Sequence, residues 1–303
     1  MLDSLLNLSL AALLVGLLYA PITLGLAISF RLLNYPDLTC EGSAIIGATV
    51  CFMLIQAGAP SWISLLGAAL AASIAGAFTA VAHSQLGVPK VLSGIVTTAL
   101  LYSITLRLLG GKSNRMTTRS TVFDILNRGN SGRMDLVVVA GVVATLLGVL
   151  FFLYRSSLGR TLRVLGDTRW FCVSIGRSPT MYLILGLAIS NAVIGLGGAM
   201  IVHFKRAVDV NMVFGLLISG LAGLVIGETI YSARSVWVHS AMCVVGSCLY
   251  NAAVGFFYFD WNPTLTKLML PSDVRFLTGL LLIIPSVIIL RFKNRYRLFG
   301  SDW

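Results

Sequence analysis

The stretch RSSLGRTLRVLGDTRWFCVSIGRSPT, Arg155–Thr180, lies between two long apolar runs, about Leu136–Tyr154 and Met181–Val202. Its many arginines are accompanied by a single acid, Asp167. An arginine at the centre of a membrane-spanning helix costs about 2.5–3.5 kcal/mol on insertion scales, so this stretch must lie at a membrane surface while its flanks cross. The density of arginine predicts the cytoplasmic surface, because cytoplasmic loops carry the excess of Lys and Arg.

Apolar residues are set among these arginines and leave two interpretations of the stretch open. A loop that only anchors the topology would explain the arginines. It would not explain the apolar residues, which suit a short amphipathic helix offered to a soluble partner. They are Leu162, Val164, Leu165, Trp170, Phe171, Val173 and Ile175. On the pattern alone, a docking surface and a simple anchor remain alternatives.

The composition places the chain in a membrane. Of its 303 residues, 57% are hydrophobic and 11% are charged, with a mean hydropathy of +0.91, whereas a soluble domain carries about 25% charged residues. The start of the chain lacks the basic region of a cleavable signal, so we expect its own spans to hold it in the membrane. The net charge of +11 predicts contact with anionic membrane lipid. No nucleic-acid-binding signature accompanies that charge, so no nucleic-acid partner is expected.

A helix needs about 20 apolar residues to cross a bilayer, and the chain holds about nine such runs. The second is short and Pro21 interrupts the first, so about eight to ten spans are possible. We therefore expect an all-α fold, that of a polytopic helical membrane protein. The runs are about Leu5–Phe30, Ser43–Ala57, Trp62–Ala82, Val91–Leu109, Leu136–Tyr154, Met181–Val202, Val213–Tyr231, Val236–Phe257 and Val274–Leu290.

Alternation of these spans sets the side of every connection once Arg155–Thr180 is fixed inside. The parts that fall outside are the N-terminus, Gly110–Asp135, Lys205–Met212 and Tyr258–Ser272. The parts that fall inside are Arg31–Gly42, Ser84–Lys90, Ser232–Ser235 and the tail Arg291–Trp303. One of them conflicts with the charge rule: Gly110–Asp135 is basic yet falls outside. It is longer than most connections, and the rule is strongest for short loops.

Two polar stretches lead into helices that are rich in small residues. The first is RLLNYPDLTCEGS, Arg31–Ser43, and the second is VDVNMVFG, Val208–Gly215. Each has an Asp followed five or six residues later by Gly, and the span count places the two stretches on opposite sides. An inverted repeat would do the same, and such breaks tend to lie near the substrate path of transporters. The repeat would divide one permease domain, residues 1–303, into halves of about 1–135 and 136–303. The alternative is two ordinary loops that match by chance.

Polar side chains at these breaks and within the spans are candidates for lining a path. Hydroxyl groups often bond back to their own helix, so each one alone is weak evidence. The candidates are Asn34, Asp37, Thr39, Glu41, Thr98, Tyr102, Asn191 and Ser219. Glu228 ends the seventh span. It is either a functional group, as ionisable residues near membrane depth often are, or an interfacial carboxylate.

Signatures of bond chemistry are missing from the sequence. The histidines stand alone and the five cysteines form no C-x-x-C pair, so neither a metal site nor a disulfide is expected. The sequence GGKS at Gly110–Ser113 is not a Walker A motif, because Leu106 stands where that motif needs Gly. We expect no catalytic residue and no cofactor bound by this chain. If ATP is used, another chain hydrolyses it.

Three blocks of the chain together resemble the permease subunits of ATP-binding cassette importers, in the group of branched-chain amino acid and sugar permeases. The likeness is greatest to the less characterised permeases of the amino-acid type. The blocks are NYPDLTCEGSAIIGA (Asn34–Ala48), LGRTLRVLGDTRWFCVSIGRSPTMYLILGLAISNAVIGLGGAM (Leu158–Met200) and AVDVNMVFGLLISGLAGLVIGE (Ala207–Glu228). The spacing between blocks also fits, so the resemblance covers most of the chain.

The resemblance implies a transport subunit that is not itself an enzyme. Two copies of this chain would bind two ATPase subunits, which carry ATP and Mg, and an external or periplasmic solute-binding protein would deliver an amino acid or a similar small solute. The location implied is a bacterial plasma (inner) membrane, with the C-terminus in the cytoplasm.

The second block matches the cytoplasmic loop that forms the coupling helix of this family, which favours the docking interpretation of residues 155–180. We expect Gly166–Gly176 to form a short helix whose apolar face, led by Trp170, enters a cleft on the ATPase. The coupling residues implied are Arg160, Arg163, Gly166, Asp167, Arg169, Trp170, Phe171 and Gly176.

Two functions of other classes remain as alternatives. A secondary transporter driven by an ion gradient would need acids deep within its spans, and Asp37 and Glu41 could serve only if they lie at the midplane. A membrane enzyme would need a polar catalytic cluster, which the sequence does not display. Co-purification with an ATPase would separate the importer from both.

The tail Arg291–Trp303 and the stretch Arg155–Thr180 are predicted to lie together on the cytoplasmic side, because both carry an excess of Lys and Arg. Single cysteines placed in each should react with an impermeant maleimide only after the membrane is opened. Labelling of both from outside intact cells would overturn the orientation.

Overall fold

The computed structural model describes residues 2–119, 121–123, 133–174, 176–213, 215–231 and 235–257. These residues form helices joined by short connections and one small pair of strands. The elements are α1 (Leu2–Ala27), the π-helical turn η1 (Ile28–Leu32), α2 (Cys40–Gln56), α3 (Ser61–Ser84), α4 (Lys90–Leu108), β1 (Asn114–Met116), α6 (Arg133–Arg155), α7 (Ser157–Asp167), α8 (Arg169–Ser174), α9 (Pro179–Lys205), β2 (Ala207–Asp209), the 3-10 turn η2 (Val210–Val213), α10 (Leu216–Ile230) and α11 (Val236–Phe257).

The helical membrane class predicted from hydropathy is confirmed. Within the described residues, 7 helices are long and apolar enough to cross a membrane, and α2 is a shorter apolar helix of 17 residues. The expected and observed bounds agree to within a few residues, and Val236–Phe257 coincides with α11. Pro21 lies inside α1 without ending it. The expected last span, Val274–Leu290, lies outside the described residues.

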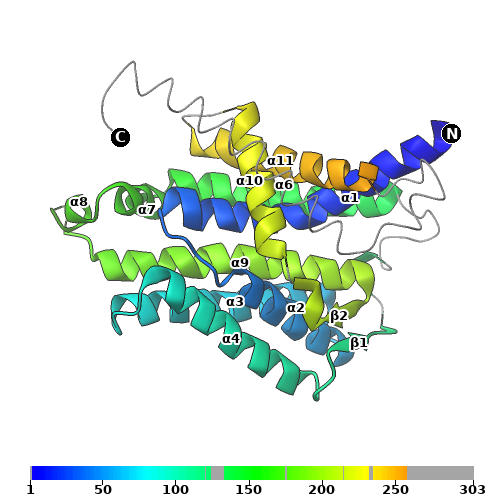
Figure 1. The fold of residues 1–303 in the computed structure, drawn as a ribbon, viewed down its shortest axis with the longest axis horizontal. Coiled ribbons are helices and arrows are strands. Elements are labelled where there is room, and N and C mark those ends of the chain that lie inside the picture. The colour runs from blue at the N-terminus through cyan, green and yellow to red at the C-terminus, as the bar shows by residue number, and fades with distance from the viewer. Residues whose placement is uncertain are drawn as a thin grey trace.

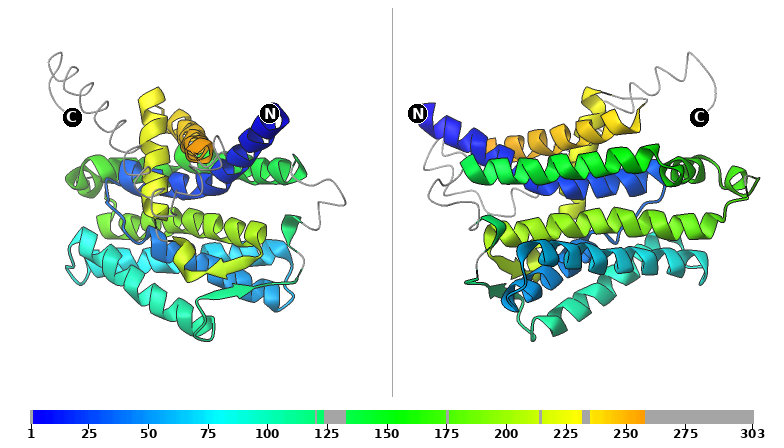
Figure 2. Two further views of the ribbon diagram at one scale, coloured as in Figure 1. Left: turned by 45° about the vertical axis from the view of Figure 1, so that its right-hand side comes forward. Right: turned by 180° about the vertical axis from the view of Figure 1, so that it is seen from behind.

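The helices form layers with α9 in the middle. In Figures 1 and 2, α2, α3 and α4 lie on one side of α9, and α1, α6 and α11 lie on the other, with most axes running in a similar direction. One helix departs from this arrangement: α10 crosses the others at a steep angle in Figure 1 and in the left view of Figure 2. It was expected as an ordinary span, and its crossing orientation depends on packing that hydropathy does not report.

Glycines on α9 allow the layers to approach closely. A Cβ atom at Gly198 would overlap the carbonyl oxygen of Ala44 on α2, and one at Gly195 would overlap Ala72 on α3. Small residues at such crossings let helix backbones pack by direct van der Waals contact, which is a main source of helix association in lipid. The central helix is therefore held by backbone proximity on the α2–α3 side.

Connections that the span count assigned to the same side lie at the same end of the molecule. At one end, the turn that follows η1, the start of α4 and the end of α7 line a common pocket. At the other end, β1 pairs antiparallel with β2 and places Arg115 opposite Val208. The Gln56 side-chain amide also donates to the Met116 carbonyl there, at 3.4 Å. The two strands and the α7–α8 segment lie at opposite ends in Figure 1.

Replacing Gly198 by Ala is predicted to lower the free energy of unfolding by about 1–3 kcal/mol, because the new methyl group must displace the α2 backbone. Unfolding of the purified chain in detergent measures the change. Gly141→Ala on α6 is the matched control, since a Cβ atom there meets nothing within 4 Å. Equal stability of both variants would show that α9 and α2 do not pack this closely.

Candidate functional site

The chain leaves helical structure between η1 and α2, and Asp37 organises this break. Asn34 adopts a left-handed backbone with φ of 49°, and α2 begins only at Cys40. The carboxylate of Asp37 accepts a bond from the Thr39 backbone N–H at 2.8 Å and from the Asn191 side-chain amide at 2.7 Å. Asp37 and Asn191 are both 0% exposed. Asn191 lies near the middle of α9, so the break is anchored deep within the bundle.

A chain of buried hydroxyl groups continues from this break into α3 and α4. The Thr39 and Thr79 hydroxyls lie 2.9 Å apart, and the Thr79 hydroxyl is 3.0 Å from that of Thr97. Near the start of α4, the Tyr35 and Ser93 hydroxyls lie 2.8 Å apart. Buried polar groups stabilise a fold only when they are satisfied. These bonds therefore fix the break against two further helices.

The second polar stretch meets the first through Glu41. The backbone N–H of Gly215, just before α10, donates to the Glu41 carboxylate at 2.9 Å. Gly215 has φ of 92°, a conformation that L side chains rarely adopt. Asp209 accepts from the Asn211 N–H at 2.8 Å, which repeats the bond between Asp37 and Thr39. The two stretches that the sequence paired therefore share a local bond and touch each other.

The predicted path residues fall into three groups. Asp37, Thr39 and Asn191 are fully buried in the hydrogen-bonded break. The second group is half-buried and lies where the first turn of α2, α4 and the start of α10 come together. Its members are Glu41, Thr98, Tyr102 and Ser219. The Thr98 hydroxyl donates to the Leu38 carbonyl at 3.0 Å, and Ser219 bonds back to Leu216 at 3.0 Å. We call this second group the junction. Asn34 is exposed and lies apart from it, beside α7.

The α7 helix is amphipathic and packs on the end of the bundle. Its first turn is capped by the Ser156 hydroxyl, which accepts from the Gly159 N–H at 3.2 Å. Leu162 and Leu165 are buried, and a Cβ atom at Gly166 would overlap the Leu32 carbonyl oxygen. The side chains that face outward include Arg160, Arg163 and Asp167. Gly166 therefore brings α7 into backbone contact with the turn that precedes the break.

The expectation of one short helix over Gly166–Gly176 is wrong. Residues up to Asp167 belong to α7, and a separate helix, α8, covers Arg169–Ser174. The chain divides at Thr168, whose backbone is extended with φ −150° and ψ 109°. Trp170 is 84% exposed and Val173 is 53% exposed. The side chains of Arg169 and Phe171 lie outside the described residues.

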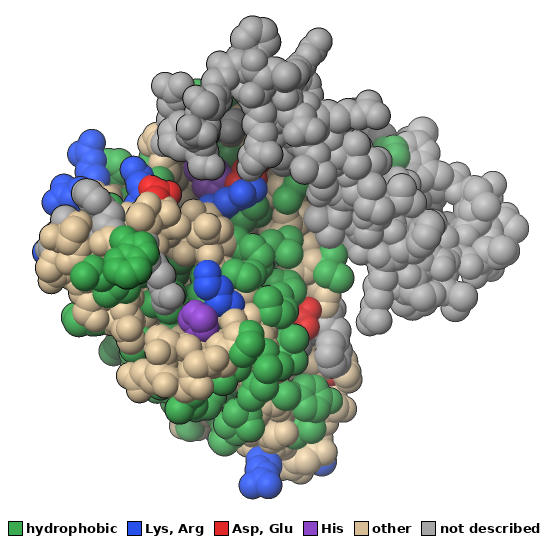
Figure 3. All heavy atoms as spheres, turned by 60° about the vertical axis from the view of Figure 1, so that its left-hand side comes forward, with side chains coloured by type: hydrophobic (Ala, Val, Ile, Leu, Met, Phe, Trp, Pro, Cys, Tyr) green, Lys and Arg blue, Asp and Glu red, His purple; other side chains and the backbone are tan. Residues whose placement is uncertain are grey.

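Gly176 ends this segment in a left-handed conformation with φ of 72°. The next residue, Arg177, donates to the Tyr182 hydroxyl at 2.6 Å, so the return into α9 is fixed. Figure 3 brings this end of the molecule forward and shows basic and hydrophobic side chains exposed near one another. The exposed Trp170 on a fixed, projecting segment is typical of an anchor residue for a partner.

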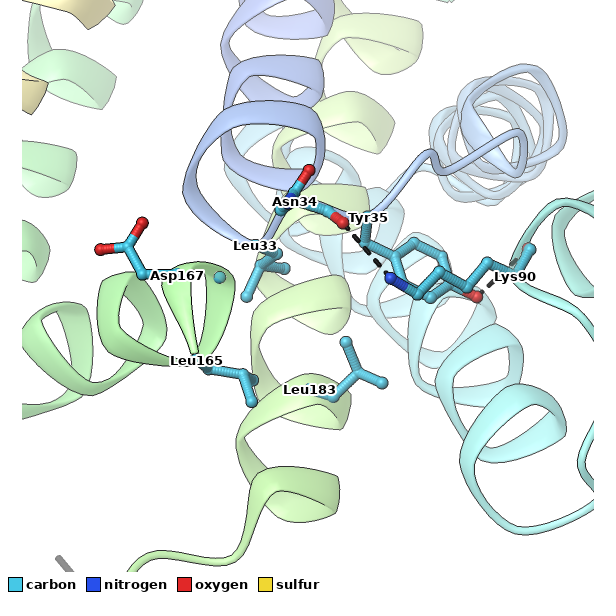
Figure 4. Close-up of a pocket in the computed structure, with 8 residues that line it drawn as sticks. Leu33, Asn34, Tyr35, Lys90, Leu165, Asp167 and Leu183 are labelled. Carbon is cyan, nitrogen blue, oxygen red and sulfur yellow. Dashed lines mark hydrogen bonds between the residues drawn. The ribbon is translucent and has the colours of Figure 1, made fainter. Parts of the chain in front are cut away.

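A pocket of about 120 Å³ lies between α7 and the turn after η1. Asp167 lies at one side of it and Lys90 at the other, with Asn34 between them (Figure 4). The Lys90 ammonium is 3.5 Å from the Asn34 carbonyl oxygen and 5.6 Å from the centre of the Tyr35 ring. The sequence did not single out Tyr35 or Lys90, because their contact joins residues far apart along the chain.

One ion pair was also not predicted. Glu228, at the end of α10, pairs with Arg31 in η1, and its other oxygen is 3.5 Å from the His239 ring. The Glu228 side chain is 13% exposed, so it is more enclosed than a surface carboxylate. Within the described ranges, no group of three or more His, Cys, Asp or Glu side chains is arranged to hold a metal ion.

The fold and these sites define a multi-pass helical membrane protein with a polar break buried against the middle of α9 and a projecting basic segment. Residues 8–285 match the family model described as "Branched-chain amino acid transport system / permease component". The chain belongs to this family and is a permease component of a transport system, as its three sequence blocks predicted.

Two relatives and one solved structure show how far the likeness extends. The tyrosine transport system permease protein of Clostridioides difficile (strain R20291) is 30% identical over 269 residues, covering 88% of this chain and 86% of that protein. The uncharacterized protein RP368 of Rickettsia prowazekii (strain Madrid E) is 27% identical over 225 residues, covering 74% and 78%. The structure of PsaBC from Streptococcus pneumoniae in complex with Fab matches 93% of this chain and 90% of its own with a TM-score of 0.51. At 13% identity, that match supports the fold alone.

Replacing Asp37 by Ala is predicted to lower the free energy of unfolding by about 1–3 kcal/mol, because the buried Asn191 amide and Thr39 N–H lose their acceptor. Thermal or denaturant unfolding in detergent measures the loss. Asp209→Ala is the control: it removes the same local bond at an exposed site and should cost less than about 1 kcal/mol. An equal effect of both substitutions would mean that the break does not depend on Asp37.

Proposed function

We propose that this chain is the transmembrane subunit of an ATP-binding cassette importer. Two copies form the translocation path, and two separate ATPase subunits, which bind ATP and Mg, drive it from the cytoplasmic side of a bacterial plasma (inner) membrane. The single observation that carries the proposal is the projecting α7–α8 segment, whose Trp170 is 84% exposed. Trp and Arg commonly anchor protein interfaces. The alternative is that Trp170 lies at the lipid headgroups as an interfacial aromatic, and the ATPase-binding test below separates the two.

The same segment supports coupling to transport. Gly166 contacts the Leu32 backbone, and the chain runs from there through the Asp37 break to Glu41 at the junction. Closure of the ATPases on ATP would displace α7 and α8. That displacement would reach the junction through rigid, hydrogen-bonded elements and would alternate access to the path.

The junction supports a path shared by two copies. Glu41, Thr98, Tyr102 and Ser219 are half-buried, and each has a polar group that a solute could contact. The remaining exposed helix faces are apolar and suit lipid: Leu70 and Ile74 of α3 are 66% and 70% exposed. Pairing two chains about the junction would enclose these polar residues and leave the apolar faces in the bilayer.

An amino acid is the solute class that the comparisons favour. The family description names branched-chain amino acid transport, and the relative from C. difficile is a tyrosine transport system permease. A solute-binding protein outside the cell would deliver the amino acid. The strand end offers it an exposed basic surface that includes Lys112, Arg115 and Arg119. An acidic solute-binding protein would be attracted to this surface. That attraction would explain why the connection Gly110–Asp135 is basic although the charge rule expects few cations outside.

Replacing Trp170 by Ala is predicted to weaken binding of the ATPase by at least about tenfold, since an interface anchor contributes about 2 kcal/mol or more. The measurement is co-purification of the native ATPase with tagged permease, together with ATP hydrolysis linked to amino-acid uptake in proteoliposomes. Phe171→Ala and Arg169→Ala should act in the same direction. The fold should survive, because Trp170 lies outside the helix packing.

Trp62→Ala on α3 is the matched control, because Trp62 is also exposed, at 63%, but lies in the first turn of α3 near the strand end. It should leave ATPase binding unchanged. If all three variants of the α8 segment keep normal ATPase binding and coupled hydrolysis, the docking assignment is wrong. If no ATPase co-purifies with the unaltered permease, the importer assignment itself fails.

A further inference from the structure

The crossing helix α10 packs on α11 through glycines. A Cβ atom at Gly227 would overlap the Met242 carbonyl oxygen, and one at Gly223 would lie 3.0 Å from the Ser247 Cα. Close contact at glycine lets two helix backbones pack by direct van der Waals contact. These contacts hold α10 against α11, and the relation of α10 to η1 and α2 depends on contacts at its two ends.

Polar contacts hold α10 at both ends. At its start, the Gly215 N–H donates to the Glu41 carboxylate at 2.9 Å. At its end, Glu228 forms the ion pair with Arg31 and approaches His239. A helix of 15 residues is about 22 Å long, so the two contacts act on well-separated points. Two such points fix the direction of a helix as well as its place.

Both contacts come from one segment of the chain. Arg31 belongs to η1 and Glu41 to the first turn of α2, and the break at Asp37 lies between them. The α7 helix touches this segment, Arg31–Glu41, through Gly166 against Leu32, in addition to packing on α6 and α9. The Glu228 side chain is 13% exposed and the Arg31 side chain 49%, so the pair joins an enclosed carboxylate to a cation that water still reaches.

We propose that Arg31, Glu228 and Glu41 are positioning residues that tie both ends of α10 to the segment Arg31–Glu41, so that α10 moves with this segment when α7 is displaced. The proposal deepens the proposed function, on which it rests, by identifying α10 as the element that alters the junction. The ion pair holds the end of α10 nearest α7, and the bond from Gly215 transmits the same displacement to the junction.

Labelling of a cysteine at the far end of α10 from the ion pair tests the proposal in the purified full chain, reconstituted in lipid nanodiscs without an ATPase. Ser219→Cys places the reporter in the first turn of α10, and the parent chain gives the background from its own cysteines. The Arg31→Gln and Glu228→Gln substitutions should each raise the rate of reaction with a hydrophilic maleimide several-fold. Combining them should add little, since either one already breaks the pair. The charge exchange Arg31→Glu with Glu228→Arg should return the rate toward that of the parent.

Arg155→Gln is the matched control, because Arg155 is a cation of the same end that contacts the Phe151 ring, 4.7 Å from its centre, on its own helix. It should leave the labelling rate unchanged. Thermal unfolding of each variant separates the alternatives. If Arg31→Gln and Glu228→Gln lower the unfolding temperature but leave labelling at position 219 unchanged, the pair is a local stabilising contact and the proposal fails. Failure of the charge exchange to restore the rate would also overturn it. No ATPase is present in this assay, so neither result bears on the importer assignment, which co-purification with the ATPase tests separately.

Discussion

The hydrogen bond from Asn191 to Asp37 is the interaction on which the rest of this structure depends. Non-helical backbone at membrane depth is tolerated only where protein or water satisfies its polar groups. Asp37 meets this requirement by accepting from Asn191 and from the Thr39 N–H. The break therefore has a fixed place on α9, and α2 starts there with its first turn inside the bundle. Glu41 can then reach the start of α10, which would be impossible if α1 and α2 were joined by a loop at the membrane surface.

A continuous route follows from this arrangement. The exposed α8 helix is connected to α7, and α7 touches the turn before the break through Gly166. From the break, Glu41 and Arg31 reach opposite ends of α10. Each step is a backbone contact, a hydrogen bond or an ion pair between elements that are otherwise rigid helices. Displacement at the projecting end would therefore be transmitted to the polar junction with little loss to side-chain motion.

The sequence predicted the parts of this structure that depend on local pattern. Hydropathy located the spans because a membrane helix must be apolar along its length, and α11 was predicted with its bounds. The similar spacing of Asp and Gly in Arg31–Ser43 and Val208–Gly215 pointed to two related breaks, and both break acids accept a backbone N–H two residues later. Their division of the chain into inverted halves stays a prediction.

The features that the sequence did not predict depend on tertiary contacts. Arg31 and Glu228 are 197 residues apart, and neither residue carries a local signal of its partner. The steep crossing of α10 follows from glycine packing against α11, which has no counterpart in hydropathy. The division between α7 and α8 occurs at Thr168, a residue that is compatible with a helix. Its extended backbone follows from the way α7 packs against the bundle while α8 projects.

Distance measurement between α3 and α10 in the assembled transporter tests the central claim most directly, because α10 should move with α8 and the segment Arg31–Glu41 rather than with α3. Spin labels at Ile74→Cys and Ile218→Cys lie on exposed positions of α3 and α10, 70% and 45% exposed. If displacement at α8 is transmitted to α10, the distance distribution shifts between the nucleotide-free state and the state trapped with ATP analogue and vanadate. An unchanged distribution in a transporter that hydrolyses ATP and accumulates its solute would contradict it.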